Sequence, residues 1–422
     1  MLGHLHRLEK SQNFSIDQIE CDQLNNLNKL LRHAKNTCDF YQDLPESITS
    51  LDEIKHLPFL EKSDLRKHAV KIRSQNAGKF VRSKTTGGST GAAVTIYKDA
   101  AGMAKELAAT WRGYRWAGVD IGDKQARFWG VPQDKSSARM AKTIDFITHR
   151  IRFSAFDFSS AALSDYVSSI NKKQPIYFYG YVSLLRELAL HIDSGQAELK
   201  CFPLAVFTTS EVLSVEDRAL LQRVFRSRVY NEYGCGEVGT IAHECVYGNM
   251  HITAENMILE CLDEQGISSS EGELVVTDLV NFAMPLIRYR IKDFGVVQAS
   301  NCECGSHLPV LSKVYGREYD ILINREGKKF HGEFFLYVIE DLKKLGISID
   351  GVQFVQIKRN EILVNISCSE RNKKDIEETI TQYLISNFHK CVSVRYEYHD
   401  SLPRESSGKL RVVKRDCEVE CA

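Results

Sequence analysis

Apolar residues recur along the chain with a spacing that changes from helical, to alternating helix and strand, to closely spaced strands. Near the N-terminus, Ser15 and Gln18 form a capping-box pattern, and the apolar residues from Ile16 to Ala34 recur at roughly helical spacing. This pattern predicts an N-terminal amphipathic helix. From residue 99 to about 240, helical stretches alternate with short apolar runs, which is typical of parallel strands wrapped by helices.

The alternating region predicts a series of helices and strands. The helices are expected near residues 99–117, 160–172, 181–193 and 215–226, and the strands at 126–130, 176–180, 204–208 and 229–233. Open α/β sheets bind ligands at the carboxyl ends of their strands, so the residues at these ends should share one rim. They are Gly130, Gly180, Thr208–Glu211 and Tyr233–Glu237.

The last third of the chain has a different pattern. Closely spaced strands within residues 251–325, such as 272–277 and 286–291, indicate a β-rich subdomain. After Gly327 the pattern predicts a small α+β domain, with helices near 333–344 and 371–387 and strands near 352–357, 361–367 and 392–398.

A chain of 422 residues exceeds what one hydrophobic core comfortably fills. We therefore predict an α/β fold in two domains. Residues 1–320 would form a large multi-layer domain with parallel sheets wrapped by helices plus the β-rich subdomain. Residues 321–422 would form a small, mobile C-terminal α+β domain.

Composition narrows the choice of partners. The 55 basic and 55 acidic residues cancel, so no broad field favours nucleic acid or an anionic membrane. The N-terminus lacks the apolar run of a signal peptide, and no stretch approaches the roughly 20 apolar residues that span a bilayer. We expect a cytoplasmic protein without a membrane span, whose partners are small molecules.

Two segments at opposite ends of the chain suit phosphate binding. The first comprises Thr85, Thr86, Gly87, Gly88, Ser89, Thr90 and Gly91. Its glycines let backbone N–H groups approach phosphate oxygens, and its hydroxyls add donors without adding charge. A strand at 94–97 follows, so we expect a strand-to-strand turn and not the strand-to-helix setting of a P-loop ATPase. Taken alone, the segment also fits a polar hairpin turn.

The second segment holds Lys409, which follows a flexible glycine near the C-terminus and could be swung onto a phosphate. Between the two ends lie three further motifs. Tyr233–Glu237 offers an aromatic face, a glycine and a carboxylate, which suit a nucleotide base and Mg²⁺. Asp293 ends the segment 288–293, in which charged residues alternate with others along a predicted strand. Its carboxylate could accept hydrogen bonds from ribose hydroxyls. An exposed strand with salt bridges would have the same sequence pattern. Gly316–Asp320 could be a hinge or an ordinary linker.

In this order, the motifs resemble those of the adenylate-forming superfamily. Its recurring elements are a Ser/Thr/Gly phosphate loop, Tyr-Gly-x-x-Glu, a ribose-binding Asp, a Gly-Arg-x-x-Asp hinge and a Leu-Pro-Arg-x-x-Ser-Gly-Lys tail. The resemblance covers nearly the whole chain. Residues 30–36 and 57–66 look specifically like the phenylacetate-CoA ligase branch, including its capsule- and O-antigen-cluster relatives.

The resemblance implies a role for each matching position. Thr86–Gly91 would hold the β- and γ-phosphates, with Thr85 beside them, and Tyr233 and Gly234 would lie by the adenosine. Glu237 would ligate Mg²⁺, and Asp293 would bind the ribose. The catalytic residues would be Lys409, Glu237 and Thr86, with Lys409 bridging the substrate carboxylate and the α-phosphate. Ser210, Glu211 and Arg317 are assigned to nucleotide binding, and Asp320 to the hinge.

This sequence departs from the superfamily pattern in three places. Ala92–Val94 stands where Pro and Lys commonly follow the phosphate loop. Gly236 replaces a hydroxyl residue before the glutamate, which removes a donor to the α-phosphate. The tail Arg404–Lys409 differs within its loop but keeps the lysine.

The expected reaction is ATP-dependent activation of a carboxylic acid to an acyl-adenylate with release of pyrophosphate, followed by transfer of the acyl group to coenzyme A. ATP, Mg²⁺ and coenzyme A would be required, and relatives of this size suggest a homodimer. Two alternatives stay open. The acceptor could be an amine, such as an amino sugar in surface-polysaccharide assembly, or the protein could bind nucleotide without turnover.

A cysteine and histidine cluster is independent of this resemblance. Cys245, His251, Cys302 and Cys304 offer three thiolates and an imidazole, a complete tetrahedral set for a structural zinc ion. Buried free cysteines are the alternative, and His243 or His307 could replace one ligand. Four aromatic residues could shape an acyl pocket or simply fill the core, namely Trp129, Tyr177, Tyr179 and Tyr181.

Overall fold

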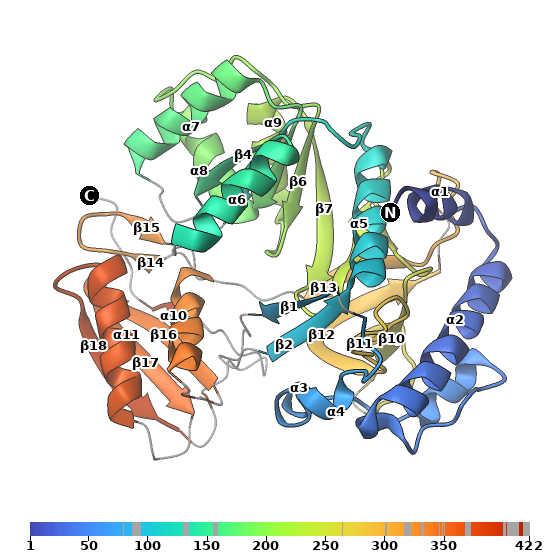
Figure 1. Cartoon of the computed structure of the whole chain (residues 1–422). Helices are drawn as coiled ribbons and strands as arrows, with labels where there is room; N and C mark the ends of the chain where they lie inside the picture. The colour runs from blue at the N-terminus through green and yellow to red at the C-terminus, as the bar shows by residue number, and fades with distance from the viewer. Residues whose placement is uncertain are drawn as a thin grey trace.

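The computed structural model describes residues 1–78, 80–86, 94–129, 135–154, 159–263, 265–299, 302–315, 322–330, 333–345, 347, 349, 351–367, 373–399, 402 and 413–416. An 11-stranded mixed sheet dominates these residues, in the order β10-β11-β12-β13-β9-β8-β7-β6-β5-β3-β4 (Figure 1). Its strands are β3 Gln125–Trp129, β4 Arg150–Ser154, β5 Tyr177–Tyr181, β6 Ala205–Thr209, β7 Arg228–Cys235, β8 Gly239–Glu244, β9 Met250–Ile252, β10 Met257–Leu262, β11 Glu271–Asp278, β12 Tyr289–Gln298 and β13 Val310–Tyr315.

One half of the sheet is parallel. Strands β4, β3, β5, β6 and β7 pair in parallel, and helices connect them. The connecting helices are α6 Lys135–Ile147, α7 Ser160–Lys173, α8 Val182–Asp193 and α9 Val215–Phe225, and α5 Ala100–Trp116 precedes β3. One apolar core lies between α7, α8, α9 and one face of the sheet, and α5 packs an aromatic cluster against the other face. The predicted α/β class is therefore confirmed.

The strands of the β-rich region extend this same sheet and do not form a sheet of their own. β7 pairs antiparallel with β8, and antiparallel pairing continues through β9, β13, β12, β11 and β10. The predicted strand at 286–291 begins only at Tyr289, because Arg288 has a left-handed backbone with φ 49°. This backbone conformation interrupts the extended chain just before β12.

The N-terminal segment covers the antiparallel half with helices. They are α1 Leu2–Ser11, α2 Ile16–Thr37, η1 Asp39–Tyr41, η2 Leu51–His56, α3 Lys62–Lys67 and α4 Ala69–Ile72. The predicted capping box is present at the start of α2, where Gln18 N donates to Ser15 Oγ at 3.3 Å and Ser15 N donates to Gln18 Oε1 at 3.0 Å. One buried face of α2 joins the same core as β8, β10, β11 and β12.

Strands β1 Val81–Thr86 and β2 Val94–Asp99 form a separate antiparallel hairpin. Thr86 pairs directly with Val94, so the segment between them connects two strands. The predicted strand-to-strand setting of the glycine-rich segment is confirmed. No helix among the described residues is long and apolar enough to cross a membrane.

A C-terminal α+β domain is present, as predicted. It contains β14 Leu322–Ile323, β15 Lys329–Phe330, α10 Glu333–Lys344, β16 Gly351–Lys358, β17 Glu361–Ser367, α11 Lys373–Asn387, β18 Ser393–Tyr398 and β19 Val413–Arg415. Its main sheet has the order β18-β17-β16-β19, and its apolar residues form a hydrophobic core separate from those of the larger part. These elements, orange and red in Figure 1, gather at one side of the molecule.

Helix α5 approaches β8 closely at a glycine. A Cβ atom on Gly113 would lie only 2.4 Å from Cγ of His243, far inside van der Waals contact. The absence of a side chain at Gly113 therefore allows α5 to lie against β8 with the imidazole between them.

Candidate functional site

Two of the predicted nucleotide-binding residues meet in space. The hydroxyl of Tyr233, on β7, donates a hydrogen bond of 2.8 Å to Oδ2 of Asp293, on β12. Three strands separate β7 from β12 in the sheet, and in a flat sheet this separation would be about 19 Å. The antiparallel half must therefore curl strongly, which brings the two motifs together.

Glu237 lies beside this pair, in the turn that joins β7 to β8, and it is buried. The hydroxyl of Tyr289 donates to its Oε1 atom at 3.4 Å, and Lys62 Nζ lies 3.6 Å from the same oxygen. A carboxylate is a suitable ligand for Mg²⁺, but in this structure the ammonium group of Lys62 pairs with the same oxygen and would have to give way to the ion.

Lys62 and Tyr289 were not assigned to the site from the sequence. Lys62 is the first residue of α3, within the segment 57–66 that resembles the ligase branch, and Tyr289 opens β12 four residues before Asp293. Both belong to segments that the sequence analysis singled out, but no spacing rule connects them to Glu237. Their contacts with Glu237 come from long-range packing of α3 and β12 around the turn that holds it.

The backbone of Gly234 lies very close to the neighbouring strand. A Cβ atom there would lie 2.4 Å from the carbonyl oxygen of Gly239, and the β7–β8 register shifts between Tyr233 and Gly234. The close approach is therefore to the neighbouring strand. Next in the chain, burial raises the pKa of the Cys235 thiol to about 12, and the nearby Glu237 carboxylate raises it further. Cys235 is a neutral thiol and not an activated nucleophile.

Ser210 and Glu211 follow β6. Ser210 is exposed and has φ 68°, an uncommon left-handed conformation for a residue with a side chain. The Glu211 carboxylate accepts hydrogen bonds from Ser183 N at 2.6 Å and from Ser183 Oγ at 3.0 Å. Glu211 thus holds the first turn of α8, a structural role that the sequence did not predict.

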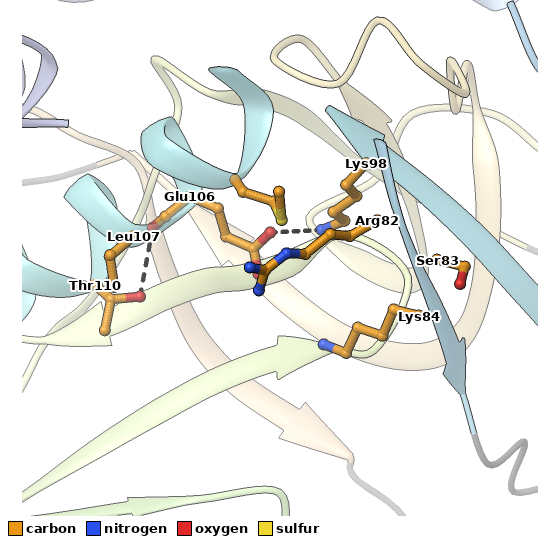
Figure 2. A pocket seen from close by; sticks show the side chains of 8 residues that line it. Arg82, Ser83, Lys84, Lys98, Glu106, Leu107 and Thr110 are labelled. Carbon is orange, nitrogen blue, oxygen red and sulfur yellow. Dashed lines mark hydrogen bonds and ion pairs between the residues drawn. The ribbon is translucent and has the colours of Figure 1, made fainter. Parts of the chain in front are cut away.

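A cavity of about 300 Å³ lies between β1, β2 and α5. It is lined by Arg82, Ser83, Lys84, Lys98, Met103, Glu106, Leu107 and Thr110. Lys98 Nζ donates to Glu106 Oε2 at 2.6 Å and to the carbonyl oxygen of Val238 at 2.8 Å, so the cavity adjoins the residue after Glu237. In Figure 2 the charged ends of Arg82 and Lys84 point to the same side as Glu106. Three basic groups and one carboxylate give the cavity a net positive lining.

The four candidate acyl-pocket aromatics lie in apolar clusters of the parallel half. Trp129 stacks on Tyr179 at 5.6 Å and contacts Tyr181 at 4.3 Å between ring centroids. Tyr177 and Tyr179 also pack with residues of α5 and β6. These contacts are those of core residues.

A buried acid lies under the aromatic cluster. Tyr179 donates to Glu232 Oε1 at 3.3 Å, and desolvation raises the pKa of Glu232 to about 7. Its other oxygen lies 3.4 Å from Nε2 of His243, whose pKa burial lowers to about 3. At moderately acidic pH this pair is therefore neutral.

The predicted zinc ligands come together. The ligand atoms of Cys245, His251, Cys302 and Cys304 all lie within 4.8 Å of one another. The suggested substitutes do not join them: His243 faces Glu232, and His307 Nδ1 lies 3.1 Å from the carbonyl oxygen of Phe14.

Several predicted site residues lie outside the described part of the chain. They are Gly87, Gly88, Ser89, Thr90, Gly91, Arg317, Asp320 and Lys409, together with Gly130 of the expected rim and Gly316 of the hinge motif. Thr85 and Thr86 are placed by their backbones in β1. Their roles stay predictions.

Comparison with known proteins identifies relatives of the whole chain. Residues 322–416 match the model of the CapK C-terminal domain. The chain is 24% identical over 414 residues to Protein CapK of Staphylococcus aureus, covering 93% of this chain and 89% of that protein. It is 27% identical over 349 residues to the phenylacetate-coenzyme A ligase of Aromatoleum evansii, covering 76% and 75%.

A solved structure shares the fold. The structure of 2-hydroxyisobutyryl-CoA ligase in complex with 2-HIB-AMP and CoA in the thioesterification state matches with a TM-score of 0.63 at 15% identity. The match covers 96% of this chain and 92% of that one. At this identity the likeness establishes a common fold.

Proposed function

Because this chain is homologous to CapK and to phenylacetate-CoA ligases, we propose that it is an AMP-forming ligase that activates a carboxylic acid with ATP and transfers the acyl group to coenzyme A. The observation that carries the proposal is the contact of Tyr233 with Asp293 beside Glu237. These residues come from motifs far apart in the sequence, and they meet where the resemblance requires one nucleotide site.

Each residue has a distinct task in the proposed site. Asp293 accepts the ribose hydroxyls, and the ring of Tyr233 lies by the adenine. The segment Thr85–Gly91 holds the β- and γ-phosphates, with Arg317, Ser210 and Glu211 as further nucleotide contacts. Glu237 would hold Mg²⁺, which would supply positive charge to neutralise the phosphates.

The net positive lining of the cavity at Arg82, Lys84 and Lys98 supports this placement, because the cavity adjoins β1 and the glycine-rich segment continues from β1. A positive lining next to the phosphate segment attracts anions such as the polyphosphate of ATP.

The proposed chemistry has two steps. A carboxylate oxygen of the acid attacks the α-phosphorus of ATP, and the bond from that phosphorus to the β-phosphate oxygen breaks, releasing pyrophosphate. The sulfur of coenzyme A then attacks the acyl carbon and loses its proton, and AMP leaves with the electrons of the acyl–oxygen bond. Both steps bring anionic or electron-rich groups together. The site must therefore supply hydrogen-bond donors or positive charges directed at the negative charge that develops.

Lys409 is the proposed mobile donor of the first step, bridging the carboxylate and the α-phosphate. The C-terminal domain, residues 321–422, would rotate about Asp320 against residues 1–320, withdraw the ammonium group and admit the acceptor. The zinc expected at Cys245, His251, Cys302 and Cys304 takes no part, because four protein ligands leave no open position.

A second candidate acceptor is an amine. The match with CapK extends over 93% of this chain, more than the 76% shared with the phenylacetate-coenzyme A ligase. Because CapK belongs with capsule-related functions, an amino sugar of surface-polysaccharide assembly stays open as the acceptor beside coenzyme A. Both reactions share the adenylation step.

Acid-dependent ATP–pyrophosphate exchange over a panel of carboxylic acids tests the proposal. Exchange should appear with at least one acid, and Lys409→Ala should reduce it by about 100-fold or more. Lys414→Ala is the matched control, since Lys414 lies on β19 and pairs with Asp416 on the surface. Unchanged exchange in Lys409→Ala would refute the role of this lysine.

The acceptor is then identified by product mass with coenzyme A or an amino sugar present. A thioester supports the first candidate, and an amide supports the second. If ATP binds but no acid supports exchange, the protein is a nucleotide-binding protein without turnover, and the proposed reaction is wrong.

A further inference from the structure

Four metal-ligating side chains converge away from the proposed reaction site. Cys245 follows the end of β8, His251 lies on β9, and Cys302 and Cys304 precede β13. The Sγ atoms of Cys245 and Cys302 are 3.6 Å apart, and Cys304 Sγ lies 3.2 Å from Nε2 of His251. Sulfur ligands about 2.3 Å from a tetrahedral zinc ion stand about 3.7 Å apart, so the observed spacing suits such an ion.

The imidazole of His251 is oriented for metal binding. The side chain is fully buried, and its Nδ1 atom lies 3.0 Å from the carbonyl oxygen of Leu308. A carbonyl oxygen can only accept, so Nδ1 carries the proton and Nε2 presents its lone pair to the sulfurs. This arrangement, in which the second ring nitrogen donates to a backbone carbonyl, fixes the tautomer that a metal requires.

The thiols are presented by two glycine-containing turns. Gly248 N donates to the carbonyl oxygen of Cys245 at 3.0 Å, and Gly305 N donates to that of Cys302 at 3.1 Å. Both glycines have a left-handed backbone, with φ 86° and 80°, which a residue with a side chain rarely adopts. The two turns therefore fix the backbone positions of Cys245 and Cys302 in the cluster.

Two further donors point at the sulfurs. Tyr247 N lies 3.4 Å from Sγ of Cys245, and Asn249 Nδ2 lies 3.2 Å from Sγ of Cys302. Hydrogen bonds to sulfur favour the thiolate, which is the form that binds metal. A disulfide between Cys245 and Cys302 is absent, because their sulfur atoms are much farther apart than the roughly 2.05 Å of that bond.

From this geometry we propose that Cys245, His251, Cys302 and Cys304 bind one Zn²⁺ in a closed structural site. Three thiolates and one imidazole complete a tetrahedron, so no position remains for water or substrate. The ion ties the turn between β8 and β9 to the segment before β13.

The site also anchors the N-terminal helices. Ser306 Oγ donates to the carbonyl oxygen of Gln12 at 3.1 Å, and His307 lies within hydrogen-bond distance of Phe14 at the junction of α1 and α2. Ser306 and His307 lie two and three positions after the proposed ligand Cys304 in the chain. Metal binding should therefore stabilise the packing of α1 and α2 on the sheet.

The test begins with full-length protein purified under reducing conditions without chelator. Elemental analysis should find about one zinc per chain, and a mercurial reagent should release it. Cys302→Ser and Cys304→Ser should lower zinc affinity by at least about tenfold, whereas Cys201→Ser, a cysteine outside the cluster, should not. Cobalt-substituted wild type should show the visible bands of a tetrahedral thiolate site.

Zinc content below about a tenth per chain together with no cobalt spectrum would overturn the proposal. So would a wild-type mass 2 Da below the reduced value that maps to Cys245 and Cys302, about the mass of the two hydrogens lost when a disulfide forms. The wild-type measurements do not depend on whether a cysteine variant folds. They also need neither ATP nor an acid, so their failure is distinct from failure of the proposed ligase reaction.

Discussion

The hydroxyl of Tyr233 and the Oδ2 atom of Asp293 lie 2.8 Å apart, although β8, β9 and β13 separate their strands in the sheet. The contact exists only because the antiparallel half curls back on itself. It brings an aromatic ring and a carboxylate together, and Glu237 follows Tyr233 by four residues in the chain. The proposed nucleotide site therefore depends on the curvature of the sheet, which brings together the motifs that contain Tyr233 and Asp293.

Asp293→Ala should weaken ATP binding strongly. Loss of a charged acceptor costs about 1.5–3 kcal/mol, so the KM for ATP in pyrophosphate exchange should rise by about 10-fold to 150-fold. Tyr233→Phe keeps the ring and removes only the hydroxyl, so its effect should be smaller. The control is Tyr396→Phe, which removes a hydroxyl that hydrogen-bonds to Thr381 in the C-terminal domain. An unaltered KM in Asp293→Ala would remove this residue from the ribose site.

Glu237→Gln should make the reaction demand more Mg²⁺. The amide has the shape of the carboxylate but lacks the charge that a hard cation prefers, and the maximal rate should fall by about 100-fold. Titration of exchange activity with Mg²⁺ measures both effects. Glu198→Gln, an exposed glutamate beside Lys200, serves as control. A variant with wild-type Mg²⁺ dependence would show that Glu237 holds no metal.

Asp278→Asn should change how stability depends on pH. Burial raises the pKa of Asp278 from 3.8 to about 6, and its Oδ2 atom has no hydrogen-bond partner among the described residues. The folded state thus binds this proton more tightly than the unfolded state does. Its contribution to stability is complete below about pH 4 and is lost as the pH rises through about 6.

The neutral amide in Asp278→Asn does not ionise, so this variant does not lose stability in that pH range for this reason. The free energy of unfolding of Asp278→Asn, relative to wild type, should therefore increase by about 2–3 kcal/mol between pH 4 and pH 7. Urea denaturation at several pH values measures it, with the exposed Asp165→Asn as control. A difference that stays constant with pH would show that Asp278 has an ordinary pKa.

Arg288→Ala should destabilise the larger part of the chain. The guanidinium is buried, donates to both oxygens of Glu260 at 2.8 and 3.0 Å, and donates to the carbonyl oxygens of Lys55 and Leu57. Its removal leaves the Glu260 carboxylate, whose side chain is only 12% exposed, without its partner, which costs about 3–5 kcal/mol in chemical denaturation. Arg223→Ala, which breaks an exposed pair with Asp193, should change stability little. If Arg288→Ala and Arg223→Ala lowered the free energy of unfolding equally, the larger contribution assigned to Arg288 would be wrong.

Periodicity predicted the fold class because most of the strands and helices of the parallel half are strongly patterned. It missed β4, where Arg150 and Arg152 interrupt the apolar run of an edge strand, and α6 before it. The predicted start of β12 is too early because the backbone of Arg288 is left-handed, a conformation that the apolar pattern does not reveal.

The sequence also located Tyr233, Glu237 and Asp293, since each belongs to a motif with its own spacing. It did not reveal Lys62 or Tyr289, whose contacts with Glu237 depend on long-range packing. Nor did it reveal that Gly234 packs on the carbonyl of Gly239, which belongs to the next strand. Contacts between strands cannot be read from local spacing.

Gly113 sets the distance between a helix and a strand. In most helices alanine is better than glycine by about 1 kcal/mol, so Gly113→Ala would ordinarily raise stability. Here the added methyl group would collide with the imidazole of His243. The usual preference should reverse, because the added methyl group would force α5 and β8 apart where the bare backbone of Gly113 now lets them approach.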